Sequence, residues 1–155
     1  MIFIYRVTAA FESHHVEYAI AGGWAVALHG AVRGTMDVDF VLEISKKNFA
    51  AAETALKSIG LLPRLPLKAD ELVDFREEYI KNKNLTAWSF YNPTRPSEIV
   101  DVIVTSDLKE MRVVNKKVGH RSLKVLAIPD LIEMKQKAGR PQDLEDVRAL
   151  KELQK

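Results

Sequence analysis

Asp37 and Asp39 have a spacing that could bring two carboxylates together. They lie in MDVDFVLEI, residues 36–44, which alternates at first and then becomes continuously apolar. This pattern predicts a strand whose first residues are exposed to solvent and whose later residues are buried. Residues i and i+2 of a strand point to the same face, so the two carboxylates should project together. A cation such as Mg²⁺ would relieve their repulsion, whereas a solvated edge strand would tolerate it without one.

Gly22 and Gly23 stand between a short apolar run, YAIA, and an alanine-rich segment that begins at Trp24. The order predicts a buried strand, a tight turn and a helix that ends near Gly30. Glycines at such a turn let the backbone approach a ligand, and the N–H groups that follow them can bind an anion. Any tight turn would also use two glycines. A phosphate cradle followed by an acid pair is a more specific combination than either feature alone.

Asp101 is the single aspartate in SEIVDVIVT, residues 97–105, a segment rich in β-branched residues. A buried aspartate is costly without a cation, hydrogen bonds or a wet cleft. If this strand lies beside residues 36–44, Asp101 can share a metal with Asp37 and Asp39 or accept the proton of an attacking hydroxyl.

Other patterns supply the elements that must position these residues. Ser45 is a good N-cap for a helix that runs to Gly60, and prolines at the first helical position predict helices over 129–138 and 141–153. A first helix over 4–15 and a strand over 85–92 complete the expected set, and Pro63 and Pro66 mark a loop between residue 60 and that strand. We therefore expect one domain over residues 1–155, an α/β (α+β) fold with a short mixed sheet covered by helices on one side, and a C-terminal helix pair.

Composition narrows the class of protein. The chain has 155 residues, 47% of them hydrophobic and 28% charged, a net charge of +2 and no cysteine. These values are typical of a globular domain with neither a disulfide framework nor a thiolate metal site. No apolar run approaches the roughly 20 residues that span a bilayer. Arg6 interrupts the apolar start and argues against a signal peptide, so we expect a cytoplasmic protein.

The run GGWAVALHGAVRGTMDVDF resembles the signature of the DNA polymerase beta-type nucleotidyltransferases, in which Gly-Gly precedes an acid pair by about a dozen residues. It is most similar to small bacterial and archaeal members related to AbiE-type toxins and to minimal nucleotidyltransferases. The segment LIEMKQKAGRPQDLEDVRAL also resembles a helical part of that family. The likeness extends from about residue 18 to 150, with the middle unmatched, and Trp24 departs from the small or hydroxyl residue that many transferases have there.

The resemblance implies a role for each matched position. Asp37, Asp39 and Asp101 would be catalytic and would bind two Mg²⁺ ions, with Mn²⁺ as the alternative. The nucleotide would be bound by Gly22, Gly23, Arg33, Thr35 and Lys135. Arg33 would contact a phosphate or pair with a nearby acid. Lys135 would be a solvated lysine that reaches the triphosphate, while Arg140, Asp143 and Asp146 would brace the helix pair or line the cleft.

The implied reaction moves a nucleoside monophosphate from a nucleoside triphosphate to a hydroxyl and releases pyrophosphate. RNA, a protein and a small molecule all remain open as acceptors. The rival hypothesis is a non-catalytic protein of the same fold that acts as an antitoxin-like or regulatory partner of another protein. Mg²⁺-dependent binding of ATP is required by the enzyme hypothesis but not by the rival.

Overall fold

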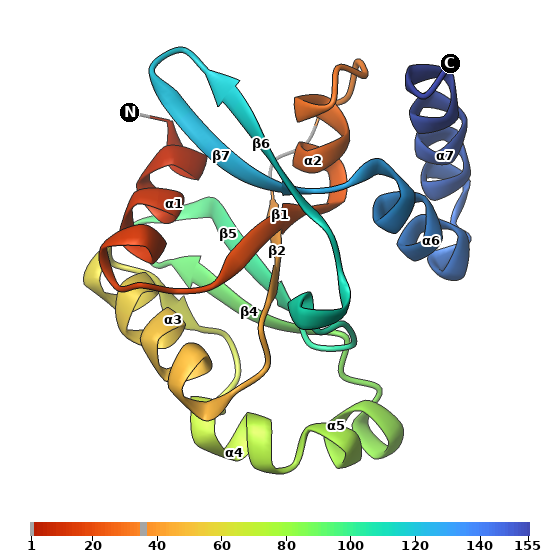
Figure 1. Cartoon of the computed structure of the whole chain (residues 1–155). Helices are drawn as coiled ribbons and strands as arrows, with labels where there is room; N and C mark the ends of the chain where they lie inside the picture. Colours follow the sequence, from red (N-terminus) through yellow and green to blue (C-terminus); the bar gives the residue numbers. More distant parts are fainter. Residues whose placement is uncertain (1, 35–36) are drawn as a thin grey trace.

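A computed structural model describes residues 2–34 and 37–155 of the chain, which form a mixed sheet with helices packed around it (Figure 1). Across the sheet the strand order is β3-β4-β5-β2-β1-β7-β6. The strands are β1 Tyr18–Ala21, β2 Val38–Leu42, β3 Leu62–Pro63, β4 Ala87–Asn92, β5 Arg95–Ile103, β6 Val113–Val118 and β7 Arg121–Leu126. The helices are α1 Phe3–Ser13, α2 Gly22–Leu28, α3 Lys46–Ser58, α4 Ala69–Asp74, α5 Arg76–Lys83, α6 Ile128–Ala138 and α7 Pro141–Leu153, with a 3₁₀ turn, η1, at Leu108–Glu110.

The centre of the sheet pairs strands that are far apart in the sequence. Strand β2 runs antiparallel to β1 and parallel to β5, and β1 is also parallel to β7. The expected neighbourhood of residues 36–44 and 97–105 is therefore confirmed. Strands β4 and β5, and β6 and β7, form antiparallel hairpins, and the short β3 pairs antiparallel with β4 at one edge of the sheet.

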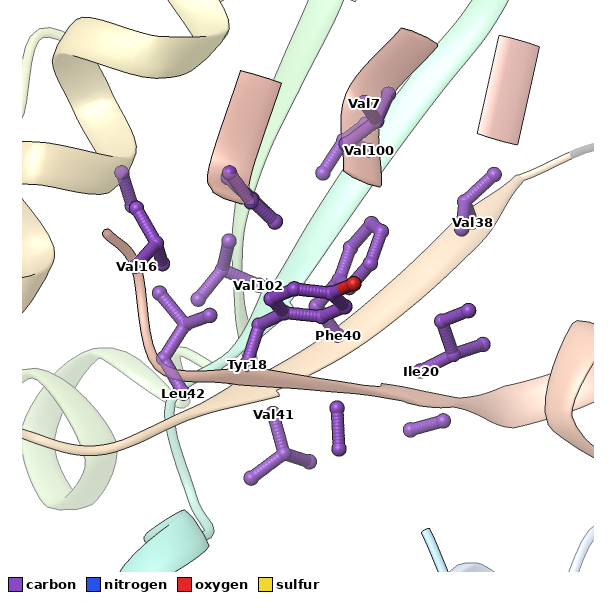
Figure 2. Packing of buried hydrophobic residues seen from close by; sticks show 14 of the residues in the cluster. Val7, Val16, Tyr18, Ile20, Val38, Phe40, Val41, Leu42, Val100 and Val102 are labelled. Atoms are coloured by element: carbon purple, nitrogen blue, oxygen red, sulfur yellow. The ribbon is translucent and has the colours of Figure 1, made fainter. Parts of the chain in front are cut away.

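One face of the sheet carries the aromatic core. Figure 2 shows Tyr18, Phe40, Val100 and Val102 gathered on one side of the strands, with Val41 on the other. The Phe40 ring meets Phe11 of α1 edge-on, with 4.9 Å between the ring centroids. These side chains are fully buried, and the edge-to-face geometry is one that aromatic rings prefer. Because side chains alternate along a strand, Asp39, which precedes Phe40 in β2, lies on the opposite face of the sheet.

Helices lie against both faces of the sheet. On the aromatic face, α3 contributes Phe49, which stacks on Trp88 of β4 at 5.5 Å. On the other face, Leu131 and Met134 of α6 line the same cavity as Asp39. The expectation that helices cover one side only is wrong, because the C-terminal helix pair folds back over the face that carries the aspartates.

The local signals at helix ends were informative. The Ser45 hydroxyl accepts a hydrogen bond from the Asn48 backbone N–H at 3.0 Å and so caps α3 as predicted. Gly139, in the left-handed region at φ 65°, separates α6 from α7. In contrast, α4, α5 and the β6–β7 hairpin were not foreseen. No helix within residues 2–34 and 37–155 is long and apolar enough to cross a membrane.

Candidate active site

Four residues on four neighbouring strands form one transverse row on the second face of the sheet. The pairing registers place Ala21 opposite Asp39, Asp39 opposite Asp101, and Asp101 opposite Ser89. Adjacent strands lie about 4.8 Å apart, and directly paired residues share a face. Asp39 and Asp101 are therefore immediate neighbours on the same face. Ser89 donates a hydrogen bond of 2.5 Å from its hydroxyl to Asp101 Oδ1.

Gly22 makes room for the Asp39 carboxylate. It follows β1 directly, has a φ of 60°, and a Cβ at this position would stand 2.0 Å from Asp39 Oδ2. Only glycine meets both requirements, because other residues rarely adopt positive φ and would collide with the carboxylate. Gly23 is the next residue of α2 and is buried. The Gly-Gly turn and the acid pair, separate in the sequence, are therefore parts of one arrangement.

The Asp39 carboxyl is held in a setting that disfavours its charge. Its pKa is raised from 3.8 to about 6, mainly by burial and next by the negative charge of Asp101, although Lys135 opposes the shift. Burial disfavours an ionised carboxyl and a like charge adds to the penalty. A cation at this place would reverse both effects.

A cavity of about 730 Å³ opens over the acid pair. Pockets of this size accommodate small-molecule ligands. Gly22, Asp39 and Asp101 line it together with Lys135, Arg140 and Asp143 from the C-terminal helices. The rest of the lining comes from Glu110 of η1, from residues along α6 between 130 and 138, and from residues 86, 87, 103, 105–107 and 111. The sequence patterns gave no hint of η1, whose place depends on the unforeseen turn after β5.

Asp37 lies near this site but does not line its cavity. It is exposed, precedes β2, and is not among the residues that line the cavity. Partial burial of its carboxyl and the charge of Asp101 raise its pKa, while Arg64 opposes the shift. Asp37 thus lies within electrostatic reach of Asp101 without joining Asp39 and Asp101 in the cavity lining.

Lys135 is a buried ion-pair partner, so the expectation of a solvated lysine is wrong. It is only 8% exposed. Its ammonium nitrogen lies 3.3 Å from Asp143 Oδ1 and 2.9 Å from Asp146 Oδ2, both on α7. The same side chain lines the cavity and acts electrostatically on Asp39. Lys135 therefore combines a structural position between two helices with a place at the candidate site.

The two carboxylates of α7 stay ionised because of their partners. Burial by itself would raise the pKa of Asp143, but hydrogen bonds from Arg140 and Lys135 outweigh it and hold the pKa below its usual value. For Asp146, Lys135, Gln142 and Arg33 outweigh burial in the same way. Arg33 Nε lies 3.1 Å from Asp146 Oδ1. Of the two roles left open for Arg33, the structure shows the acid pair.

The remaining predicted nucleotide-binding residue, Thr35, lies outside the described residues. Arg140 lines the cavity and also pairs with Asp143, with 2.7 Å between Nε and Oδ2. The candidate site thus joins Gly22, Asp39, Asp101 and Lys135, with Gly23 next to it. Asp37 does not line the cavity, and Arg33 pairs with Asp146 of α7.

The donors fit a divalent cation in part. Within residues 2–34 and 37–155, no three His, Cys, Asp or Glu side chains come together in a ready metal cluster. Asp39 and Asp101 form a pair of adjacent carboxylates, and the charge of Asp101 contributes to the raised pKa of Asp39. A cation between like charges would relieve their repulsion. Mg²⁺ commonly takes one or two carboxylates and completes its shell with waters and substrate phosphates. The pair meets that requirement.

Comparisons with known proteins place this geometry in context. No protein-family model matches the sequence, and no curated protein matches it. Several solved structures do match the fold of this chain. The lincosamide antibiotic adenylyltransferase LnuA, bound to lincomycin, superposes with a TM-score of 0.67 at 13% identity, covering 97% of this chain and 96% of its own.

Two further structures have the same architecture. The antibiotic-resistance factor ANT(2'')-Ia superposes with a TM-score of 0.65 at 14% identity, over 96% of this chain and 80% of its own. An antigenic nucleotidyltransferase-like protein from Paracoccidioides brasiliensis gives a TM-score of 0.58 at 17% identity, over 96% of this chain and 74% of its own. At such identities the likeness concerns the fold. The chain has the nucleotidyltransferase fold.

Proposed function

We propose that this protein is a metal-dependent nucleotidyltransferase that moves a nucleoside monophosphate from a nucleoside triphosphate to a hydroxyl. The observation that carries the proposal is the pairing of Asp39 with Asp101 on adjacent parallel strands, against Gly22, in the lining of a cavity. The fold of known antibiotic adenylyltransferases supports it.

In this proposal the backbone at Gly22 and Gly23 receives the β- and γ-phosphates, and Lys135 offsets part of their charge. Lys135 is held in place by Asp143 and Asp146, so it meets the nucleotide without first losing side-chain freedom. Asp39 and Asp101, with Asp37 nearby, are the residues that would hold Mg²⁺ or Mn²⁺. When bound, the metal would neutralise charge on the phosphates and favour ionisation of the attacking hydroxyl.

The chemical step is a displacement at the α-phosphorus. The acceptor oxygen forms a bond to this phosphorus, the bond to the bridging oxygen of the β-phosphate breaks, and pyrophosphate leaves. Asp101 accepts the proton of the acceptor hydroxyl. A positioned carboxylate acting as a general base contributes about 10²–10⁴-fold to the rate.

A small-molecule acceptor suits the cavity better than RNA. Seven carboxylates line the cavity against three cations, Lys135, Lys137 and Arg140; four of these carboxylates, Asp107, Glu110, Asp130 and Glu133, come from η1, the residue before it, and α6. Although Lys137 pairs with Glu133, the lining has an excess of negative charge, which disfavours a long polyanion. Antibiotics are the acceptors to test first, because one neighbour of the same fold, ANT(2'')-Ia, was solved with adenylyl-2''-tobramycin and another, LnuA, with lincomycin. The toxin-related role suggested by the AbiE-type resemblance would require an acceptor of another class.

The test incubates the protein with each α-labelled triphosphate and, separately, with hydroxyl-bearing antibiotics, total RNA or protein extract. We expect label to pass to a small-molecule acceptor and pyrophosphate to appear in Mg²⁺ but not in EDTA. The Asp101→Asn variant should lose at least about 100-fold in rate, the lower end of the base contribution. Mg²⁺-dependent triphosphate binding without transfer to any acceptor would contradict the enzyme and favour the non-catalytic partner.

A further inference from the structure

Ser89 ends the transverse row that contains the acid pair. Its place there depends on the register of the β4–β5 hairpin, which sets Ser89 opposite Asp101. Its backbone carbonyl accepts a hydrogen bond from the Arg64 N–H at 2.9 Å, which ties β4 to the chain after β3 at this position. Ser89 is therefore held from its backbone before its side chain makes any contact.

The Ser89 hydroxyl has one proton to donate, and it donates it to Asp101 Oδ1 across 2.5 Å. Hydrogen bonds from a hydroxyl to a carboxylate are short and stronger than neutral ones. With one oxygen held in this way, the Asp101 carboxylate loses rotational freedom beside Asp39. On the aromatic face, the same register sets apolar Trp88 opposite Val102, so a polar contact is confined to the face of the acid pair.

We propose that Ser89 is a positioning residue, which fixes the orientation of the Asp101 carboxylate so that Asp101 and Asp39 present a preformed pair to metal and acceptor. This inference rests on the proposed function. Groups that orient metal-binding side chains typically contribute 10–100-fold to metal affinity or activity when they are removed. Ser89 acts through Asp101 and needs no contact with substrate.

The test compares Ser89→Ala with Ser89→Thr, which keeps the hydroxyl and suits a strand. Ser97→Ala is the matched control, because Ser97 is an exposed serine on β5 itself. Each protein is assayed for kcat and for KM of the triphosphate, and Mn²⁺ affinity is measured separately by calorimetry without nucleotide. For Ser89→Ala we expect kcat and Mn²⁺ affinity to fall about tenfold or more, with KM within about twofold of the parent. Ser89→Thr should recover most of the loss, and Ser97→Ala should match the parent.

Unchanged kcat and Mn²⁺ affinity in Ser89→Ala would overturn the inference, as would a Ser89→Thr variant as impaired as Ser89→Ala. The two proposals fail separately. If the parent transfers nucleotide and Ser89→Ala does so equally well, only the role of Ser89 is wrong. If the parent transfers nothing but its Mn²⁺ affinity depends on the Ser89 hydroxyl, the positioning role stands and the transferase is wrong.

Discussion

Replacing Lys135 with alanine should destabilise the protein strongly. The change removes the cation that lies 3.3 Å from Asp143 and 2.9 Å from Asp146, two carboxylates that are 1% and 3% exposed. Breaking a buried ion pair from one side costs about 3–5 kcal/mol, because the remaining charge stays buried without compensation. Arg140 and Arg33 still contact the two carboxylates and reduce the penalty. We therefore expect a loss of about 3 kcal/mol, near the lower end of that range.

The free energy of unfolding is measured by urea denaturation at pH 7.5 and supported by thermal melting. For a chain of this size, 3 kcal/mol corresponds to a fall of about 6–12 °C in Tm. Lys137→Ala is the matched control, because Lys137 lies on the same helix with its side chain 77% exposed and pairs only with Glu133 among the contacts of the described chain. An exposed pair of this kind contributes about 0.3–0.5 kcal/mol.

The cause of the loss can be tested within the same series. If buried charge on Asp146 is responsible, adding Asp146→Asn to Lys135→Ala should cost less than the sum of the two single changes, with a coupling of at least about 1 kcal/mol. A loss below about 1 kcal/mol for Lys135→Ala, or full additivity in the double variant, would refute the buried network and return Lys135 to the solvated role that the sequence suggested.

Three further predictions concern the site and the fold. In denaturation experiments, Gly22→Ala should lower the free energy of unfolding by at least about 1–3 kcal/mol more than Gly119→Ala does. Both glycines have positive φ, 60° and 63°, but of the two only Gly22 would bring its new Cβ against another residue, Asp39. Equal losses would mean that Asp39 moves aside freely. Asp39→Asn should stabilise the metal-free protein at pH 7.5 by up to about 3 kcal/mol, and this gain should disappear as the pH falls below about 3, under the unfolded pKa. The sign follows because the folded-state pKa of Asp39 is raised from 3.8 to about 6, so its ionisation destabilises the folded protein as the pH rises through this window. A stabilisation by Asp39→Asn that does not depend on pH in EDTA would contradict this prediction. Ser45→Ala should lower the stability by about 1 kcal/mol through loss of the cap on Asn48, and a circular dichroism melt indistinguishable from the parent would argue against that cap.

Local signals predicted most of the framework that holds the site. Ser45 and Gly60 mark the ends of α3, and Pro141 marks the start of α7, because capping chemistry is confined to a few adjacent residues. Strand periodicity predicted the strands that became β2 and β5, so Asp39 and Asp101 could be recognised as site candidates before their pairing was known.

What the sequence missed depends on contacts between distant segments. The β6–β7 hairpin, with strands VVNKKV and RSLKVL, carries many lysines and arginines, and its sequence is also typical of a solvated charged segment. Helix α5 buries none of its described side chains, so it has no apolar stripe that a pattern could reveal. The burial of Lys135 depends on carboxylates of the next helix, and the contact of Ser89 with Asp101 depends on hairpin register. Neither is visible in single-residue spacing.

The most direct test of the proposed site is the stabilisation that metal and nucleotide give to the parent and to an Asp39→Asn/Asp101→Asn double variant. Melting curves are recorded for each protein in EDTA, and in Mg²⁺ with a non-hydrolysable triphosphate at about 100 times the Kd of the parent. A ligand at that concentration adds about 2.7 kcal/mol to the stability of the state that binds it, or about 5–11 °C in Tm for this chain length. We predict that increment for the parent and none for the double variant; an equal increment in both proteins would show that the paired aspartates are not the metal–nucleotide site.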